Sequence, residues 1–98
     1  MLKDFVLGFV RIHILYHAKV EPIYGAWVMQ ELERHGYELT PGTLYPILHE
    51  LEGKRFLKSR SRIVQGRRRK YYEITPRGSK ILEEVKPRIK ELVNEVLE

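Results

Sequence analysis

The chain contains no cysteine and no apolar stretch of the roughly 20 residues that a membrane-spanning helix requires. Without cysteine it has neither disulfides nor thiolate metal ligands, a composition that fits a cytoplasmic protein. The N-terminus places one lysine and one aspartate before its apolar run and offers no small-residue cleavage site, so we expect no signal peptide. We therefore predict a cytoplasmic protein with no membrane partner.

Catalytic patterns are also missing. The sequence has no Gly-rich phosphate loop, no nucleophile with a plausible base, and no carboxylate pair in a cleft-like context. We predict that the protein is not an enzyme and needs no cofactor. At 98 residues, of which 43% are hydrophobic, the chain forms one small folded unit. Its stability is expected to depend partly on a partner subunit.

Positive charge is concentrated in one part of the chain. The stretch 54–80 holds eleven of the 18 basic residues and one of the 13 acidic residues, a net +10 against −5 for the remainder. Such segregation is typical of a surface that binds a polyanion, and nucleic acid is the first candidate. An anionic membrane surface is the alternative, but the basic stretch lacks the amphipathic helical pattern that membrane binding favours.

The segment from Leu2 to His17 is apolar on nearly every side of a helix, and only Gly8 interrupts it. A helix of this kind must be covered on all sides. A small domain covers one face, so we expect the other face, with Phe5 and Phe9, to meet a second subunit.

Two shorter helices are predicted next. The first begins near Tyr24, after the break at residues 21–22, and Gly36 ends it. The residues expected on its buried face are Trp27, Val28, Leu32 and, less firmly, Met29.

The third helix is predicted to begin at Thr40, with Pro41 in the first helical position. This start leaves Pro46 inside the helix, and we expect the first turn of the helix to be irregular. A start at Thr43 is the alternative, because it would place Pro46 in the first turn, where no hydrogen bond is lost. The residues expected on the buried face are Leu44, Ile47, Leu48 and Leu51.

A hairpin and a last helix complete the pattern. Strands are predicted over 57–63 and 70–75, joined by a turn over 64–68 in which Gly66 adopts positive φ. Thr75 caps a final helix that Pro87 is expected to kink or split. The apolar seam of this helix, which we assign to a dimer interface, consists of Leu82, Val85, Ile89, Leu92 and Val96.

This order predicts a mainly α fold with a small β-hairpin, namely a winged helix-turn-helix followed by a C-terminal dimerisation helix. We divide the chain into a DNA-binding domain over 1–75 and the dimerisation helix over 76–98, which form one structural unit. The third helix would enter the major groove, and the hairpin would be the wing.

Several blocks of the sequence together resemble the PadR family of phenolic-acid-responsive transcriptional regulators. The matching blocks of this sequence are Pro22-Ile23-Tyr24-Gly25, Thr40-Pro41-Gly42-Thr43-Leu44-Tyr45-Pro46-Ile47-Leu48, Gly66-Arg67-Arg68-Arg69-Lys70-Tyr71-Tyr72 and Ile74-Thr75-Pro76-Arg77-Gly78. They follow the family's order across residues 12–82, and the short tail resembles the compact members. The resemblance implies a repressor of a nearby operon that is released when a small, often aromatic, molecule binds at the dimer.

Candidate DNA contacts fall into two groups. From the recognition helix we expect contacts by Thr40, Gly42, Thr43, Tyr45, Pro46 and His49. From the hairpin we expect contacts by Arg60, Arg62, Gln65, Arg67, Arg68, Arg69 and Lys70. Tyr45 has an alternative role as a half-buried support for its helix. Arg60 and Arg62 share a strand face and are either phosphate contacts or the solvated side of an edge strand.

The aromatic residues and histidines leave alternatives open. Phe5, Phe9, Tyr16 and Trp27 are candidates for an effector pocket, although Trp27 fits a core position better. The last helix departs from the compact members because it carries no aromatic residue with which to stack a flat drug. His13 and His17 have the spacing of a shared metal site, but no cysteine or neighbouring carboxylate accompanies them, so we expect no metal.

The leading hypothesis is a homodimeric repressor of a pseudo-palindromic operator on double-stranded DNA, released by a small aromatic or drug-like effector. The alternative is a non-specific architectural DNA-binding protein or an RNA-binding winged-helix protein. A repressor should prefer its operator by roughly 10³-fold or more, whereas the alternative predicts similar affinity for all duplexes.

Overall fold

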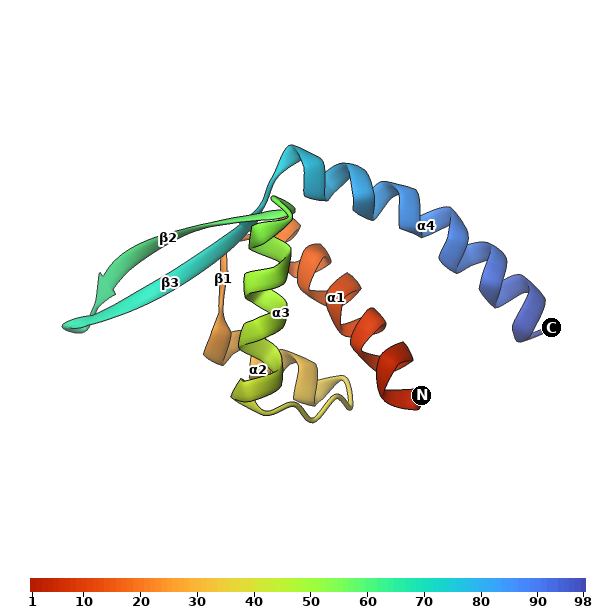
Figure 1. Cartoon of the computed structure of the whole chain (residues 1–98), viewed down its shortest axis with the longest axis horizontal. Coiled ribbons are helices and arrows are strands. Elements are labelled where there is room, and N and C mark those ends of the chain that lie inside the picture. Colours follow the sequence, from red (N-terminus) through yellow and green to blue (C-terminus); the bar gives the residue numbers. More distant parts are fainter.

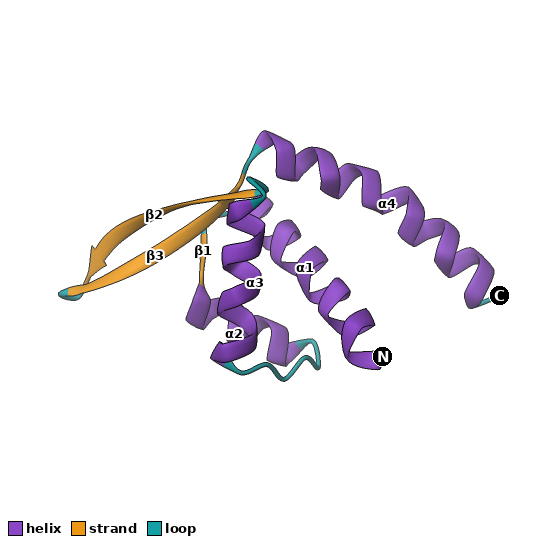
Figure 2. Ribbon diagram, in the orientation of Figure 1, coloured by secondary structure: helices purple, strands orange, loops and turns teal.

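The computed structural model describes residues 1–98 and contains four helices and one small sheet (Figure 1). The elements are α1 (Leu2–Val20), β1 (Ile23–Tyr24), α2 (Gly25–Arg34), α3 (Pro41–Gly53), β2 (Leu57–Val64), β3 (Arg67–Ile74) and α4 (Pro76–Val96). Figure 2 shows the hairpin projecting from one end of the helices and α4 extending to the other. The predicted winged helix with an additional C-terminal helix is confirmed.

The third helix begins where the sequence indicates. Thr40 is the N-cap, Pro41 is the first helical residue, and Pro46 lies inside the helix. The amides of Thr43 and Leu44 both donate to the Thr40 carbonyl at 3.0 Å. The start at Thr40 is therefore correct.

The sheet has one more strand than the sequence predicted. The two residues of β1, Ile23 and Tyr24, pair antiparallel with β3, opposite Tyr72 and Tyr71, so the strand order is β1-β3-β2. From the sequence, a helix was predicted to begin near Tyr24. A two-residue strand has no periodicity of its own, and only pairing with the distant β3 defines it.

The hairpin is longer and its turn tighter than expected. Val64 pairs with Arg67, which leaves Gln65 and Gly66 as a two-residue turn with φ of 52° and 77°. Two consecutive positive φ values are typical of the type I′ turn, whose twist matches that of the strands. Arg67 and Arg68 are therefore strand residues rather than turn residues, which corrects the predicted turn over 64–68.

The last helix is continuous. Thr75 caps it, accepting a hydrogen bond from the amide of Gly78 at 3.0 Å, and the helix continues past Pro87 to Val96. The expectation that Pro87 splits the helix is wrong. Pro87 lies in the exposed part of α4, which leaves the domain core after Leu82.

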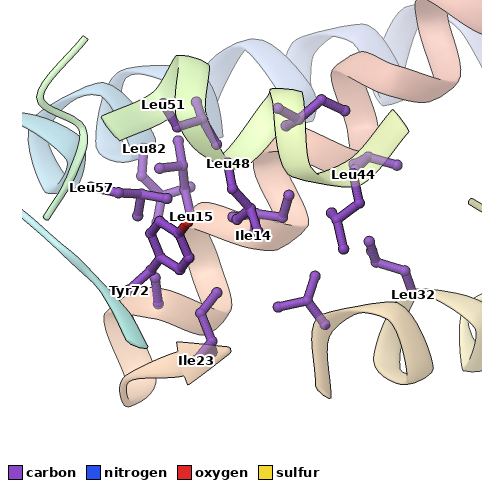
Figure 3. Packing of buried hydrophobic residues seen from close by; sticks show 14 residues of the cluster. Ile14, Leu15, Ile23, Leu32, Leu44, Leu48, Leu51, Leu57, Tyr72 and Leu82 are labelled. Atoms are coloured by element: carbon purple, nitrogen blue, oxygen red, sulfur yellow. The ribbon is translucent and has the colours of Figure 1, made fainter. Parts of the chain in front are cut away.

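The core joins all four helices to the base of the hairpin (Figure 3). Its buried residues are Val10, Ile14, Leu15, Ala18, Ile23, Val28, Leu32, Leu44, Ile47, Leu48, Leu51, Leu57, Tyr72 and Leu82. The four α3 residues are those predicted from helical spacing. Trp27 and Met29 are only half-buried at the edge of the core. The core thereby fixes α3 relative to the hairpin.

Candidate nucleic-acid interface

A groove of about 830 Å³ lies between the hairpin and the helices α2 and α3. Its lining residues are Tyr24, Gly25, Ala26, Tyr45, His49, Val64, Gln65, Arg67, Arg68, Arg69, Lys70 and Tyr72. The groove thus combines two residues of the predicted recognition helix with five of the predicted wing. These two groups are separate in sequence, and the fold places them on one concave surface.

The helix α3, which is the predicted recognition helix, presents its polar side outward. Thr40, Gly42, Pro46 and His49 are exposed, and Thr43 is half-buried. Its hydroxyl lies 3.3 Å from that of Thr40, so these two side chains form a polar pair at the helix start. Of the residues predicted to contact DNA from this helix, only Tyr45 and His49 line the groove.

Tyr45 has a structural role as well as an exposed surface. Its ring lies over the start of α2 so closely that a Cβ atom on Gly25 would overlap it. The side chain is nevertheless 40% exposed. Tyr45 therefore links α2 to α3, and it also lines the groove.

Register divides the basic residues of the hairpin between its two faces. Arg62 is directly opposite Arg69, and Val64 is opposite Arg67, so the side chains of Arg60, Arg62, Arg67 and Arg69 share one face. Arg68 and Lys70 share the other. Like charges directly opposite one another destabilise a strand pair unless a counter-charge is near. No acidic side chain forms an ion pair with Arg60, Arg62, Arg67, Arg68 or Arg69. The face with Arg60, Arg62 and Arg67 is therefore suited to a polyanion, and Arg68 adds an unpaired cation on the other face.

Two wing cations are held by partners within the chain. The Arg69 guanidinium lies 4.0 Å from the centre of the Tyr24 ring and donates to the Tyr71 hydroxyl at 3.4 Å. Lys70 donates to the Glu52 carboxylate of α3 at 3.3 Å. Arg67 and Arg68 have no such partner and are exposed. These two free cations lie at the outer end of the hairpin, beside the exposed turn residue Gln65.

Glu52 joins the recognition helix to both strands of the hairpin. It accepts hydrogen bonds from the Ser59 hydroxyl on β2 and from Lys70 on β3. The Ser59 hydrogen bond, aided by Lys70, holds the pKa of the Glu52 carboxyl below its ordinary value. The carboxylate therefore stays charged and fixes the hairpin relative to α3. This contact was not predicted from the sequence, because Glu52 and Lys70 are far apart in the chain.

The apolar residues assigned to a dimer interface differ in their burial. Phe5, Phe9, Ile89, Leu92 and Val96 are exposed in the single chain, and Val85 is half-buried. Leu82 is instead a buried member of the chain's own core. Its assignment to the interface is therefore wrong. The exposed residues lie on α1 and α4, which contact each other (Figure 1).

A second cavity, of about 780 Å³, lies among α1, α2 and α4. Phe9 and Tyr16 line it, together with Ile12, Ile89 and Leu92. Phe5 and Trp27 do not line it. Phe5 is exposed, and Trp27 packs edge-on against the His17 ring at 5.3 Å.

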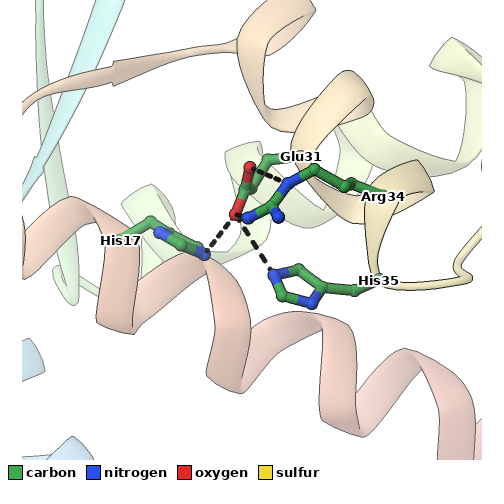
Figure 4. Close-up of polar contacts among 4 residues, drawn as sticks. All are labelled: His17, Glu31, Arg34 and His35. Atoms are coloured by element: carbon green, nitrogen blue, oxygen red, sulfur yellow. Dashed lines mark hydrogen bonds and ion pairs between the residues drawn. The ribbon is translucent and has the colours of Figure 1, made fainter.

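The polar wall of this second cavity is built on Glu31. Figure 4 shows its carboxylate contacting His17, Arg34 and His35. The Arg34 guanidinium donates to it at 2.9 and 3.2 Å, and the His35 Nε2 atom lies 3.1 Å away. The hydrogen bond from Arg34 lowers the pKa of Glu31 to about 2, so the carboxylate is charged at neutral pH.

No helix is long and apolar enough to span a bilayer. Comparison with known proteins gives consistent matches. Residues 14–84 match the model of the transcriptional regulator PadR-like family. The chain is 48% identical over 96 residues to transcriptional regulator Rv3488 of Mycobacterium tuberculosis, a match that covers 98% of this chain and 90% of that protein.

Solved structures give the same result. A PadR-like transcription factor from Bacteroides fragilis is 30% identical, with a TM-score of 0.83 over 96% of this chain and 92% of that one. A PadR-like transcriptional regulator from Bacillus cereus is 29% identical, with a TM-score of 0.82 over 97% of both chains. The similarity therefore extends over nearly the whole chain, including α4.

Proposed function

The chain belongs to the PadR-like family of transcriptional regulators, and on this premise we propose that it is a homodimeric repressor whose operator binding is controlled by a small molecule. Membership of this family makes it a regulator rather than an enzyme. The observation that carries the proposal is the groove that combines recognition-helix residues with unpaired wing cations. A cytoplasmic location would follow from the DNA target.

The recognition helix supplies the sequence-reading part of the proposal. His49 and Tyr45 line the groove, and both side chains are able to hydrogen-bond with base edges or phosphates. Thr40 and Thr43 at the helix start extend the same polar surface. In winged helices the N-terminal part of this helix enters the major groove, so these side chains would contact successive bases.

The wing supplies affinity without sequence preference. Arg60, Arg62, Arg67 and Arg68 are exposed and have no acidic partner in the chain. Contacts from these residues to phosphates would release condensed counterions, so binding would weaken steeply as salt rises. Arg69 and Lys70 would contribute less, because aromatic rings and Glu52 already hold them.

The exposed apolar surface of α1 and α4 supports dimerisation. Phe5 is 60% exposed and Leu92 is 53% exposed. A contiguous apolar surface of this kind is unusual on a monomer. A two-fold dimer would cover it and would set two recognition helices about 34 Å apart, which matches one turn of DNA and a pseudo-palindromic operator.

The second cavity supports control by a small molecule. Its volume, about 780 Å³, is within the range of ligand sites, and its apolar residues come from both α1 and α4. A ligand between these helices would change the angle of α4, and with it the spacing of the two recognition helices. That change would release the operator.

The first test is a fluorescence anisotropy titration with duplexes from the region upstream of the protein's own gene. Scrambled duplexes of equal length are the control, at about 150 mM salt, where non-specific attraction is partly screened. We expect roughly 10³-fold preference for one upstream duplex, with two subunits bound per site. Equal, weak and salt-sensitive binding to all duplexes would overturn the repressor proposal and favour an architectural role.

Regulatory direction needs a separate measurement. In vitro transcription from the bound promoter should fall as the protein is added, and it should recover when an effector is supplied. A rise in transcription would contradict repression while leaving operator recognition intact.

A further inference from the structure

Three of the four histidines of the chain lie together on the wall of the second cavity. His13 and His17 are on the same side of α1, and His35 directly follows the last residue of α2. One ring nitrogen from each of the three lies within 4.8 Å of the other two. The rings of His13 and His35 are stacked with their centres 5.0 Å apart. The fold thus brings a third imidazole to the pair that the sequence had placed one helical turn apart.

A carboxylate completes the cluster. Glu31 Oε2 lies 3.1 Å from the His35 Nε2 atom and 3.6 Å from the His17 Nε2 atom (Figure 4). The Glu31 side chain is only 13% exposed. The sequence analysis expected no metal here because it found no carboxylate beside His13 and His17. Glu31 supplies that carboxylate from α2, which the linear sequence does not show.

Neighbouring aromatic rings orient two of the imidazoles. Tyr37 packs against the His13 ring at 5.3 Å, and Trp27 packs edge-on against the His17 ring at the same distance. Neither of these rings is a ligand. Fixed ring orientation and an apolar surrounding are the features that tune metal-ligating histidines.

We propose that His13, His17 and His35, together with the Glu31 carboxylate, form a binding site for a divalent transition-metal ion of the Zn²⁺ class. Three imidazoles and one carboxylate are a donor set that Zn²⁺ accepts in tetrahedral geometry. Ligand nitrogens around such an ion are about 3.3 Å apart, so small side-chain rotations must bring the three imidazoles together. The His35 side chain, at the end of α2, is 37% exposed, which leaves room for such a rotation.

Two cations lie near the cluster and act against a metal ion. Arg34 forms an ion pair with Glu31, but its side chain is 70% exposed and is free to turn into solvent when the ion binds. Lys86 of α4 lines the cavity and forms an ion pair with Glu83 at 2.6 Å. The ion would therefore replace Arg34 as the partner of Glu31, and it would link α1 to the end of α2.

Metal titration of the full chain tests the site directly. The untagged protein is titrated with Co²⁺, whose visible absorption is intense only in tetrahedral sites, and then with Zn²⁺ in competition. We expect one ion per chain. His35→Ala should weaken binding on the order of 100-fold, and Glu31→Gln about 10-fold. The matched control is His49→Ala, which removes the one histidine outside the cluster and should leave metal affinity unchanged.

Arg34→Ala gives a readout that a merely structural histidine cluster would not produce. Removing the competing guanidinium should tighten Co²⁺ binding about 3-fold or more. Zn²⁺ should also raise the unfolding temperature of the wild-type chain, and of the His49→Ala variant, but not that of His35→Ala. Circular dichroism of each metal-free variant establishes that it folds.

Absence of tetrahedral Co²⁺ absorption, or equal loss of binding in His35→Ala and His49→Ala, would overturn the inference. The titration uses no DNA, and the operator titration uses no metal. Failure to find an operator would therefore leave the metal site standing, and failure to bind metal would leave the repressor proposal standing.

Discussion

At the scale of single residues, the contact between Tyr45 and Gly25 explains why a glycine begins α2. Helices prefer other residues to glycine by up to about 1 kcal/mol, but here a side chain would meet the Tyr45 ring. We predict that Gly25→Ala lowers the free energy of unfolding by about 1–3 kcal/mol, because overpacking forces Tyr45 or α2 to move. Urea denaturation measures this change.

The matched control is Gly53→Ala at the end of α3, where a Cβ atom would meet nothing within 4 Å. It should leave stability unchanged or raise it by up to about 1 kcal/mol. Equal stability of the wild type and Gly25→Ala would show that Tyr45 is not held against α2, and its proposed place in the groove would lose support.

Arg68 and His49 are expected to contribute to DNA binding in different ways. Arg68→Ala should reduce affinity for every duplex and lower the slope of log affinity against log salt by about 0.9, the value for one phosphate contact. His49→Ala should instead weaken preference for the operator, by about 1–3 kcal/mol if it contacts a base. Anisotropy titrations at several salt concentrations, with operator and scrambled duplexes, separate the two effects. An unchanged salt slope for Arg68→Ala would remove that residue from the interface.

Sequence periodicity predicted single residues well where their neighbours lie on the same helix. Leu44, Ile47, Leu48 and Leu51 were correctly placed in the core because helical spacing alone determines which side they occupy. Glu31 was missed because its neighbour His17 lies on another helix. No pattern within one segment of the chain reports such contacts.

At the scale of secondary-structure elements, Glu52 supports the packing of the hairpin on α3 through contacts with both strands. The pKa of its carboxyl is lowered by the Ser59 hydrogen bond and by Lys70, so the contact stabilises the fold above the ordinary pKa of glutamate. We predict that Glu52→Gln destabilises the chain at pH 7 by no more than about 1 kcal/mol, since Glu52 is partly solvated. The difference from wild type should disappear as the pH falls through the lowered pKa.

Denaturation of both proteins at a series of pH values, from pH 7 down through the lowered pKa of Glu52, tests this linkage. A difference that stays constant over this range would mean that charge on Glu52 contributes nothing. DNA affinity gives a second readout, because a looser hairpin places its arginines less well. Glu73→Gln, which removes only the 3.8 Å ion pair with Lys58 within the hairpin, is the control that should leave hairpin orientation unchanged.

The sequence predicted the elements that have their own local signals and missed those that depend on distant partners. The cap at Thr75 and the helix start at Thr40 were correct, because a capping residue followed by proline is a local signal. The strand β1 exists only through its pairing with β3. The continuity of α4 through Pro87 was likewise not predictable. Proline disfavours a helix interior, but this tendency alone does not decide whether the helix ends there or continues on both sides of the proline.

At the scale of the whole molecule, charge and apolar surface are separated. The basic residues are concentrated between 54 and 80, on the hairpin and its flanks. The exposed large apolar residues, apart from Tyr45 on α3 and Ile63 on the hairpin, lie on α1 and the outer part of α4. The molecule is 52 Å long, and the hairpin and the end of α4 extend in opposite directions (Figure 1). A second copy is therefore able to cover the apolar end without touching the groove between the hairpin, α2 and α3.

This separation predicts that dimerisation is removable without damage to the groove. Leu92 lies on the exposed part of α4 and is not part of the hydrophobic core. The variant Leu92→Glu should therefore leave each chain folded while it places a charge in the proposed interface. Light scattering after size exclusion should show the mass of one chain. Operator affinity should fall by about 100-fold or more, because the second half-site is no longer bound intramolecularly.

Asn94→Glu is the matched control, since it adds the same charge to the same helix on the side away from Leu92. It should remain a dimer with wild-type affinity. Binding of the Leu92→Glu monomer to a single half-site should equal that of the wild type, because the groove with His49 and Arg68 is unchanged. A Leu92→Glu protein that stays dimeric would place the interface elsewhere, and one that is monomeric with full operator affinity would show that a single wing and recognition helix suffice.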